Sequence, residues 1–120
     1  MAAPNIVNVS TITAKTFGAR LTTTTTTSLV ANSASSGKVF KINTILVSNV
    51  DGSNSADATI SYYDGTNTRS IVTTVAVPGD STLVALDKNS VIYLEEGTSI
   101  RGGASASNDL DVLISYEEIS

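Results

Sequence analysis

Carboxylate pairs are the groups of this sequence that could carry acid–base chemistry. Two adjacent glutamate pairs lie at 95–96 and 117–118, and Asp109 and Asp111 are separated by one residue. Alternate residues of a strand point to the same side of a sheet, so the two aspartates could share a face. The apolar residues around them take the buried positions, which leaves both aspartates on the solvent side. This pattern is typical of a solvated rim and not of a catalytic pair.

Histidine and cysteine are both absent from the 120 residues. Without histidine the chain has no imidazole base, no histidine metal ligand and no Ser-His-Asp triad. Without cysteine it has no disulfide, no thiolate nucleophile and no zinc site built on thiolates. With the unsupported carboxylates, these absences predict a protein that is not an enzyme and that has neither a cofactor nor a metal centre.

Oxygen-bearing side chains gather at Asp51, Asn54 and Asp57, and again between Asp64 and Asn67. Calcium prefers such ligands, but the bidentate glutamate of a calcium-binding loop is missing. The same residue types are ordinary turn formers, because their side chains bond to the backbone two residues further on. We therefore predict turns at both places, and a structural cation near the first group stays open as the alternative.

Tyrosine supplies four of the six aromatic residues, and tryptophan is absent. Neighbouring strand residues face opposite sides, so one of Tyr62 and Tyr63 should be exposed. Tyrosine is enriched in protein contact patches, which makes Tyr63 a candidate interface residue. A sugar-binding platform is the alternative, weakened by the lack of tryptophan. Gly102-Gly103 is too weak a signal for a phosphate loop and indicates a bend or a close approach of another backbone.

Ionic groups are scarce in this chain. Charged residues make up 15% of it, against about 25% in an ordinary domain, while threonine and serine each occur 17 times. A free domain coated with hydroxyl groups would fit this composition, but a surface covered by other copies or by another protein fits it better. The net charge of −4, with no cluster of basic residues, argues against nucleic acid. No apolar run approaches the roughly 18 residues of a membrane span, which argues against a membrane partner.

Short alternating segments separated by turn residues predict eight to ten strands and no helix. Residues 38–50 form the most apolar segment, which indicates a central strand that is buried on both faces or bulged near Asn43. Asp64-Gly65 indicates a hairpin turn. The fold class is therefore all-β, a single antiparallel β-sandwich of jelly-roll type, with an immunoglobulin-like sandwich as the alternative.

The predicted sandwich domain spans residues 15–120, preceded by an extended arm or first strand at residues 1–14. Four apolar residues of that arm, exposed by its extended form, are candidate interface residues: Ile6, Val7, Val9 and Ile12. The run Thr22–Thr27 has no apolar face that would fix its register. It is interpreted as an edge strand or strand extension, or alternatively as a hydroxyl ladder against a neighbouring subunit.

Five segments of the chain carry a resemblance to a known group of proteins. They are Lys38-Val-Phe-Lys-Ile-Asn43, Val47-Ser-Asn-Val-Asp-Gly52, Ala76-Val-Pro78, Leu86-Asp-Lys-Asn-Ser-Val-Ile-Tyr-Leu-Glu-Glu-Gly97 and Ile114-Ser-Tyr-Glu-Glu-Ile119. In these segments the chain resembles small virion structural proteins of tailed bacteriophages, especially those of marine cyanophages. The resemblance implies a β-rich component of the virion without a catalytic role.

Two functions follow from these considerations. The first is a capsid decoration or cement protein that binds the major capsid protein, stabilises its lattice and forms a homo-oligomer, with a trimer favoured. The second is a tail, neck or fibre component that acts as a host-surface adhesion module through loops at one end of the sandwich. Residues 51–57, 64–67 and 103–109 are the loops expected to serve the second function.

Overall fold

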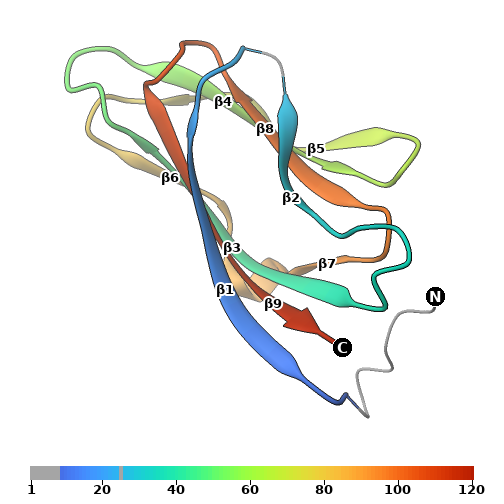
Figure 1. Ribbon diagram of the computed structural model, residues 1–120. Coiled ribbons are helices and arrows are strands. Elements are labelled where there is room, and N and C mark those ends of the chain that lie inside the picture. Colours follow the sequence, from blue (N-terminus) through green and yellow to red (C-terminus); the bar gives the residue numbers. More distant parts are fainter. Residues whose placement is uncertain (1–8, 25) are drawn as a thin grey trace.

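The computed structural model describes residues 9–24 and 26–120, which fold into nine strands in two antiparallel sheets (Figure 1). A single 3₁₀ turn, η1 (Lys88–Ser90), interrupts the strands of this described part. The sheets pack together as a sandwich, which confirms the predicted all-β class. In chain order the strands are β1 (Ile12–Leu21), β2 (Thr27–Ala31), β3 (Val39–Asn49), β4 (Ala56–Tyr63), β5 (Thr68–Val77), β6 (Thr82–Leu86), β7 (Ile92–Leu94), β8 (Ser99–Ala104) and β9 (Leu110–Ile119).

The chain crosses repeatedly from one sheet to the other. Sheet A has the order β1-β9-β3-β6, with β7 also paired to β3, and sheet B has the order β2-β8-β4-β5. Six connections link opposite sheets: β1 to β2, β2 to β3, β3 to β4, β5 to β6, β7 to β8 and β8 to β9. The alternative fold differs, because an immunoglobulin-like sandwich places its first two strands in one sheet.

The core lies between the sheets and follows the predicted alternation of β9. Leu110, Val112 and Ile114 are fully buried, whereas Leu113 between them is exposed. Gly102 on β8 faces this core, and a Cβ atom there would lie 2.7 Å from Leu29 Cδ1. Gly102 therefore leaves room for the Leu29 side chain, and the atoms close to it belong to side chains and not to another backbone.

A bulge at Asn43 lets β3 bury both of its halves. The register of β3 against β9 shifts between Ile42 and Thr44. Before the bulge the even-numbered residues Phe40 and Ile42 are buried. After the bulge the odd-numbered residues, beginning with Ile45, are buried instead. Of the two predicted explanations for this apolar segment, the structure shows the bulge.

Two buried asparagines hold the two ends of the sandwich. At the end of β3, Asn49 Nδ2 donates to the carbonyl oxygens of Asn54 at 2.9 Å and Val77 at 2.8 Å, and its Oδ1 accepts from the Asp51 backbone N–H at 2.8 Å. After β2, Asn32 Nδ2 donates to the carbonyl oxygens of Lys38 and Leu94, at 2.9 and 3.0 Å. Each amide therefore satisfies backbone groups of loops that would otherwise be buried without partners.

Glu118 ties the start of β1 and the start of β3 to β9. Its carboxylate accepts from Lys15 Nζ at 3.0 Å and from Lys38 Nζ at 3.1 Å, and its side chain is 13% exposed. Burial of the carboxyl group raises the pKa of Glu118, but the hydrogen bonds and charges of the two lysines outweigh this and hold the pKa below its ordinary value. The ionised carboxylate therefore stabilises the folded chain.

The Thr22–Thr27 run is mostly a loop between the sheets, and the predicted strand extension was wrong for its described part before Thr27. The carbonyl oxygens of Thr22 and Thr23 accept hydrogen bonds from Ser107 Oγ and the Ala104 backbone N–H, at 3.0 and 3.2 Å. Thr27 alone begins β2. A run of identical residues presents no face to bury, so the crossing between sheets determines its conformation.

The segment predicted as an extended arm or first strand is in part a strand. Ile12 to Ala14 begin β1 and pair with residues 117–119 of β9. Val9 is half-buried, and Ile12 is exposed. Ile6 and Val7 lie outside the described residues. The strand thus begins before the expected domain boundary at residue 15.

Removing the Asn49 amide should destabilise the fold strongly. In Asn49→Ala the buried Val77 carbonyl and two partly buried backbone groups lose their partner, which is expected to lower the free energy of unfolding by about 3 kcal/mol. Urea denaturation measures this difference. Asn89→Ala is the control, because Asn89 is exposed on η1, and it should change the stability by less than about 0.5 kcal/mol. Equal effects of the two substitutions would contradict the assigned role of Asn49.

Glu118 should also make stability depend on pH. Its pKa is lowered in the folded chain, so its contribution is present above the ordinary glutamate pKa of 4.5 and disappears as the pH falls through the folded value. Glu118→Gln should therefore lower the melting temperature at neutral pH and match the unsubstituted chain in strong acid. Thermal unfolding across the acid range tests this, with Glu95→Gln as a matched control at an exposed glutamate. A Glu118→Gln deficit of equal size at every pH would contradict it.

Candidate functional site

An apolar row crosses the outer face of sheet A. Gly18 on β1 lies opposite Leu113 on β9, Leu113 lies opposite Leu46 on β3, and Leu46 lies opposite Val84 on β6. Residues directly opposite each other in a sheet share a face, so these four form one row across four strands. Leu113 and Val84 are 46% and 56% exposed. We call these four residues the apolar row.

A polar row runs beside the apolar row. Arg20 on β1 makes a two-pronged ion pair with Asp111 on β9, with Nε–Oδ1 at 2.7 Å and Nη2–Oδ2 at 3.2 Å. Further along the same row, the hydroxyl groups of Ser48 and Thr82 lie 3.0 Å apart. The hydrogen bond from Arg20 lowers the pKa of Asp111 from its ordinary value, so the pair is ionised at neutral pH.

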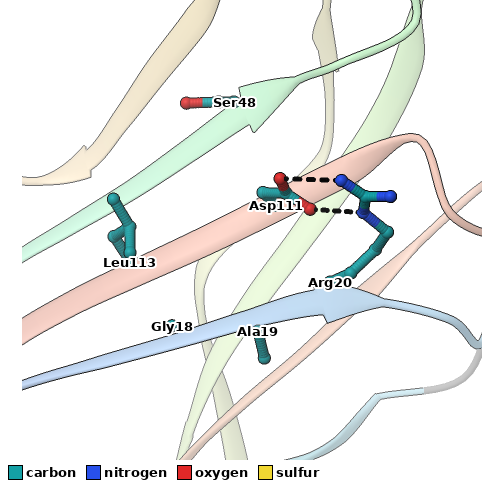
Figure 2. A pocket seen from close by; sticks show the side chains of 6 residues that line it. All are labelled: Gly18, Ala19, Arg20, Ser48, Asp111 and Leu113. Atoms are coloured by element: carbon teal, nitrogen blue, oxygen red, sulfur yellow. Dashed lines mark hydrogen bonds and ion pairs between the residues drawn. The ribbon is translucent and has the colours of Figure 1, made fainter.

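An open groove of about 520 Å³ lies where the two rows meet (Figure 2). Figure 2 shows the Arg20–Asp111 pair at one side of this groove and Leu113 further along β9. A Cβ atom at Gly18 would lie 3.0 Å from Leu113 Cδ2, so the glycine leaves room for the leucine side chain beside β1. The groove therefore combines an apolar wall with a fixed, neutralised ion pair.

The opposite side of the apolar row is lined by hydroxyl groups. Thr16, Ser115 and Thr44 are paired across β1, β9 and β3. Beyond them the exposed Tyr93 lies opposite Lys41 on the neighbouring strand. An exposed apolar row framed by polar rows is the anatomy of a protein-binding surface, whose centre is apolar and whose rim is polar.

Several of the carboxylates singled out in the sequence contact other groups of the fold. The Asp111 carboxylate is bound to Arg20. Within the glutamate pairs, Glu96 Oε2 accepts from the Gly37 backbone N–H, and Glu117 Oε1 accepts from Asn43 Nδ2. These contacts hold strands and loops, and none of them joins two carboxylates.

The loop at Asp51 shows turn chemistry. Asp51 Oδ1 accepts from the backbone N–H groups of Ser53 and Asn54, at 2.9 and 3.4 Å, and these bonds lower the pKa of Asp51. Asp57 belongs to β4 instead, where its backbone bonds to Ser105. No cluster of three metal-binding side chains occurs among residues 9–24 and 26–120. The Asp64 carboxylate likewise accepts from the backbone N–H groups of Thr66 and Asn67, which closes the hairpin between β4 and β5.

Tyr63 lies on the outer face of sheet B beneath an arginine. The Arg101 guanidinium carbon is 3.8 Å from the centre of the Tyr63 ring, a cation–π contact, and the Tyr63 hydroxyl donates to the Gly65 carbonyl oxygen at 2.9 Å. Tyr62 packs against the core on the other side. Both tyrosines are half-buried, so the predicted exposure of one of them was wrong, because Arg101 covers the Tyr63 ring. Arg101 lies opposite Ser61, and Ser61 Oγ and Arg101 Nε are both buried without a hydrogen-bond partner.

The three loops expected to serve adhesion are divided between the two ends of the sandwich. Residues 51–57 and 103–109 meet, because Asp57 and Ser105 exchange two hydrogen bonds of 2.7 and 2.9 Å. The 64–67 turn follows the opposite end of β4 and lies close to Gly97 instead. No single surface can therefore be formed by all three loops.

Sequence reasoning missed Arg20, Leu113, Val84 and Arg101. Arg20 and Asp111 are 91 residues apart, and the four members of the apolar row come from four strands. Their proximity depends on strand order and register, which no local pattern specifies. The one available signal was Leu113, an apolar residue at an outward position of an otherwise clean alternation.

Within the described residues, no helix is both long and apolar enough to cross a membrane. No protein-family model matches the chain, and no curated protein matches it either. Among solved structures, the chain is similar to two crystal structures of a pentameric capsid protein isolated from metagenomic phage sequences, one of them solved by iodide SAD phasing. In both cases the identity is 17%, the TM-score is 0.40 and 99% of this chain is covered. This chain spans 64% and 66% of the lengths of those two chains.

Proposed function

We propose that this chain is a structural protein of a bacteriophage virion, a decoration or cement protein that binds the major capsid protein. The observation that carries the proposal is the apolar row on the outer face of sheet A. Exposed apolar side chains that are grouped in this way mark a contact surface. The chain buries this row when it lies on the capsid lattice, and so links neighbouring capsid subunits.

The electrostatics of the face support docking. Arg20 and Asp111 neutralise each other beside the row, so a partner that covers them meets no unpaired charge. Such exposed pairs contribute little to stability but fix the position of both side chains. The net charge of −4 suits the outside of a shell filled with DNA better than its inner wall.

The sequence resemblance to virion proteins of tailed phages supports the same role. A protein present in many copies needs only a modest contact at each site, because about 800 Å² per partner is a standard interface and repetition on a lattice adds avidity. The scarcity of charged residues fits a molecule whose surface is covered in the particle. The proposal includes a homotrimer placed over junctions between capsomers.

A charge in the apolar row should weaken binding to shells. Leu113→Asp places a carboxylate in the middle of the proposed contact, and we expect the affinity for shells that lack this protein to fall at least about tenfold, or about 1.4 kcal/mol. Leu113 is exposed, so the fold should persist. Cosedimentation with purified shells measures the binding, and circular dichroism checks the fold.

Val50→Asp is the control for this experiment. Val50 is similarly exposed but follows β3 in a loop and lies outside the apolar row. Val50→Asp should leave shell binding unchanged. Equal losses of binding in both variants would contradict the assignment of the outer face of sheet A as the contact surface.

Mass spectrometry of virions gives the copy number: hundreds of copies support decoration. A few copies would instead indicate a tail, neck or fibre component that acts in host adhesion, and would contradict the proposal.

The N-terminal segment before β1 is the second proposed contact. An extended segment can add a strand to a neighbouring protein, with affinity supplied by backbone hydrogen bonds. Deletion of residues 2–8, which include Ile6 and Val7, leaves β1 whole and should weaken shell binding without lowering the melting temperature. Unchanged binding of the truncated chain would show that the segment makes no such contact.

A further inference from the structure

Within the described residues the two sheets have four edges, and three of these edges are interrupted. The β2 edge has five residues and a register shift between Ser28 and Val30, and the β6–β7 edge is split into strands of five and three residues. The β5 edge has two register shifts against β4 and a positive φ of 46° at Thr74. Short or bulged edges are the usual protection against pairing with another chain.

The fourth edge, β1, is continuous. Its ten residues pair with β9 in one unbroken register, and the strand contains no proline. Its two charges are already engaged, because Lys15 binds Glu118 and Arg20 binds Asp111. Neither charge is therefore left free to repel an added strand. A long, regular and uncovered edge is a template for another strand.

The hydrogen bonds at the start of β1 identify its free backbone groups. Thr11 and Ser120 exchange both backbone bonds, at 2.9 and 3.0 Å. Pairs alternate along an antiparallel ladder, so the N–H and C=O groups of every second residue of β1, beginning with Ile12, point away from β9. In the described part of the chain no hydrogen bond reaches these groups, which belong to Ile12, Ala14, Thr16, Gly18 and Arg20.

We infer that the β1 edge pairs with β1 of a second copy of this chain, antiparallel and about a twofold axis at Thr16. Thr16 then lies opposite its own counterpart, Ala14 opposite Gly18, and Ile12 opposite Arg20. In each strand the five residues whose backbone groups point away from β9 all pair with the other copy, which forms about ten backbone hydrogen bonds. The two sheets A become one continuous sheet.

Charge and side-chain size select this register. A shift that moves the axis to Lys15 would place two lysines directly opposite each other, which is unfavourable. With the axis at Thr16, Lys15 lies opposite Phe17 of the second copy instead. Small side chains at Ala14, Thr16 and Gly18 also keep the outer face flat where the two copies meet.

This pairing does not depend on the proposed function. It is a twofold contact, whereas a trimer closes through a threefold one, so the two contacts use different surfaces and can coexist. If the chain does bind shells, the pairing places two apolar rows on one continuous sheet. A protein that failed to bind shells would still show the pairing in solution.

A single cysteine tests the register, because the chain contains none of its own. The Cα atoms of opposed residues in a hydrogen-bonded pair lie about 5.5 Å apart, which a disulfide can span. Thr16→Cys should therefore give a covalent dimer on mild oxidation, seen on a non-reducing denaturing gel. Thr13→Cys is the control on the same strand, since its two copies would lie roughly 20 Å apart. Equal cross-linking of the two variants would overturn the inference.

A proline at the same position tests the hydrogen bonds. Among the residues that the structure describes, the Thr16 N–H has no partner, so Thr16→Pro should keep the fold by circular dichroism while it removes a donor from the edge. Thr16→Val keeps the donor and serves as the control. We expect at least a tenfold weaker self-association for Thr16→Pro than for Thr16→Val in sedimentation velocity. Equal association, or no association of the unsubstituted chain at high concentration, would overturn the inference.

Discussion

The bulge at Asn43 in β3 is the constraint on which the rest of the structure depends. β3 is the strand of sheet A that pairs with β9 on one side and with β6 and β7 on the other. Without the extra residue, either Phe40 and Ile42 or Ile45 and Val47 would face solvent, because side chains alternate strictly along a strand. The bulge lets one strand of eleven residues close the core along its whole length.

The register set by β3 also creates the outer face. After the bulge Leu46 and Ser48 point to the outer face of sheet A. Leu46 joins Leu113 of β9 to Val84 of β6 in the apolar row, and Ser48 joins Asp111 of β9 to Thr82 of β6 in the polar row. The groove beside the Arg20–Asp111 pair is thus a consequence of how the core is closed. Core and surface are coupled here through a single strand.

Two buried asparagine side chains pair with backbone groups that apolar side chains could not satisfy. Loops that cross between sheets carry backbone groups into the interior, and each such group costs free energy unless it has a partner. Asn49 provides three such partners at one end of the sandwich, and Asn32 serves the loop ends near Leu94 at the other. A local pattern does not reveal these roles, since asparagine signals a turn whether its side chain is exposed or buried.

Much of the fold followed from local pattern. The alternation from Leu110 to Ile114, the hairpin at Asp64-Gly65 and the bulge near Asn43 are all present in the sequence. In β5, by contrast, two register shifts interrupt the alternation, and Thr73 is exposed between the half-buried Ile71 and Val75. A bulge at an edge strand leaves little trace in hydrophobic periodicity, since the residues that it displaces face solvent in any case.

The two interaction features of the molecule lie on the same sheet. Sheet A carries the exposed row of Leu113 and Val84 and the uninterrupted β1 edge, while both edges of sheet B are bulged. Natural proteins protect the sheet edges that they leave in solvent, so the regular β1 edge supports the proposal that sheet A is the layer that contacts other proteins. A local sequence pattern can identify β1 and β9 as strands, but only their common register with β3 and β6 shows that face and edge belong to one surface.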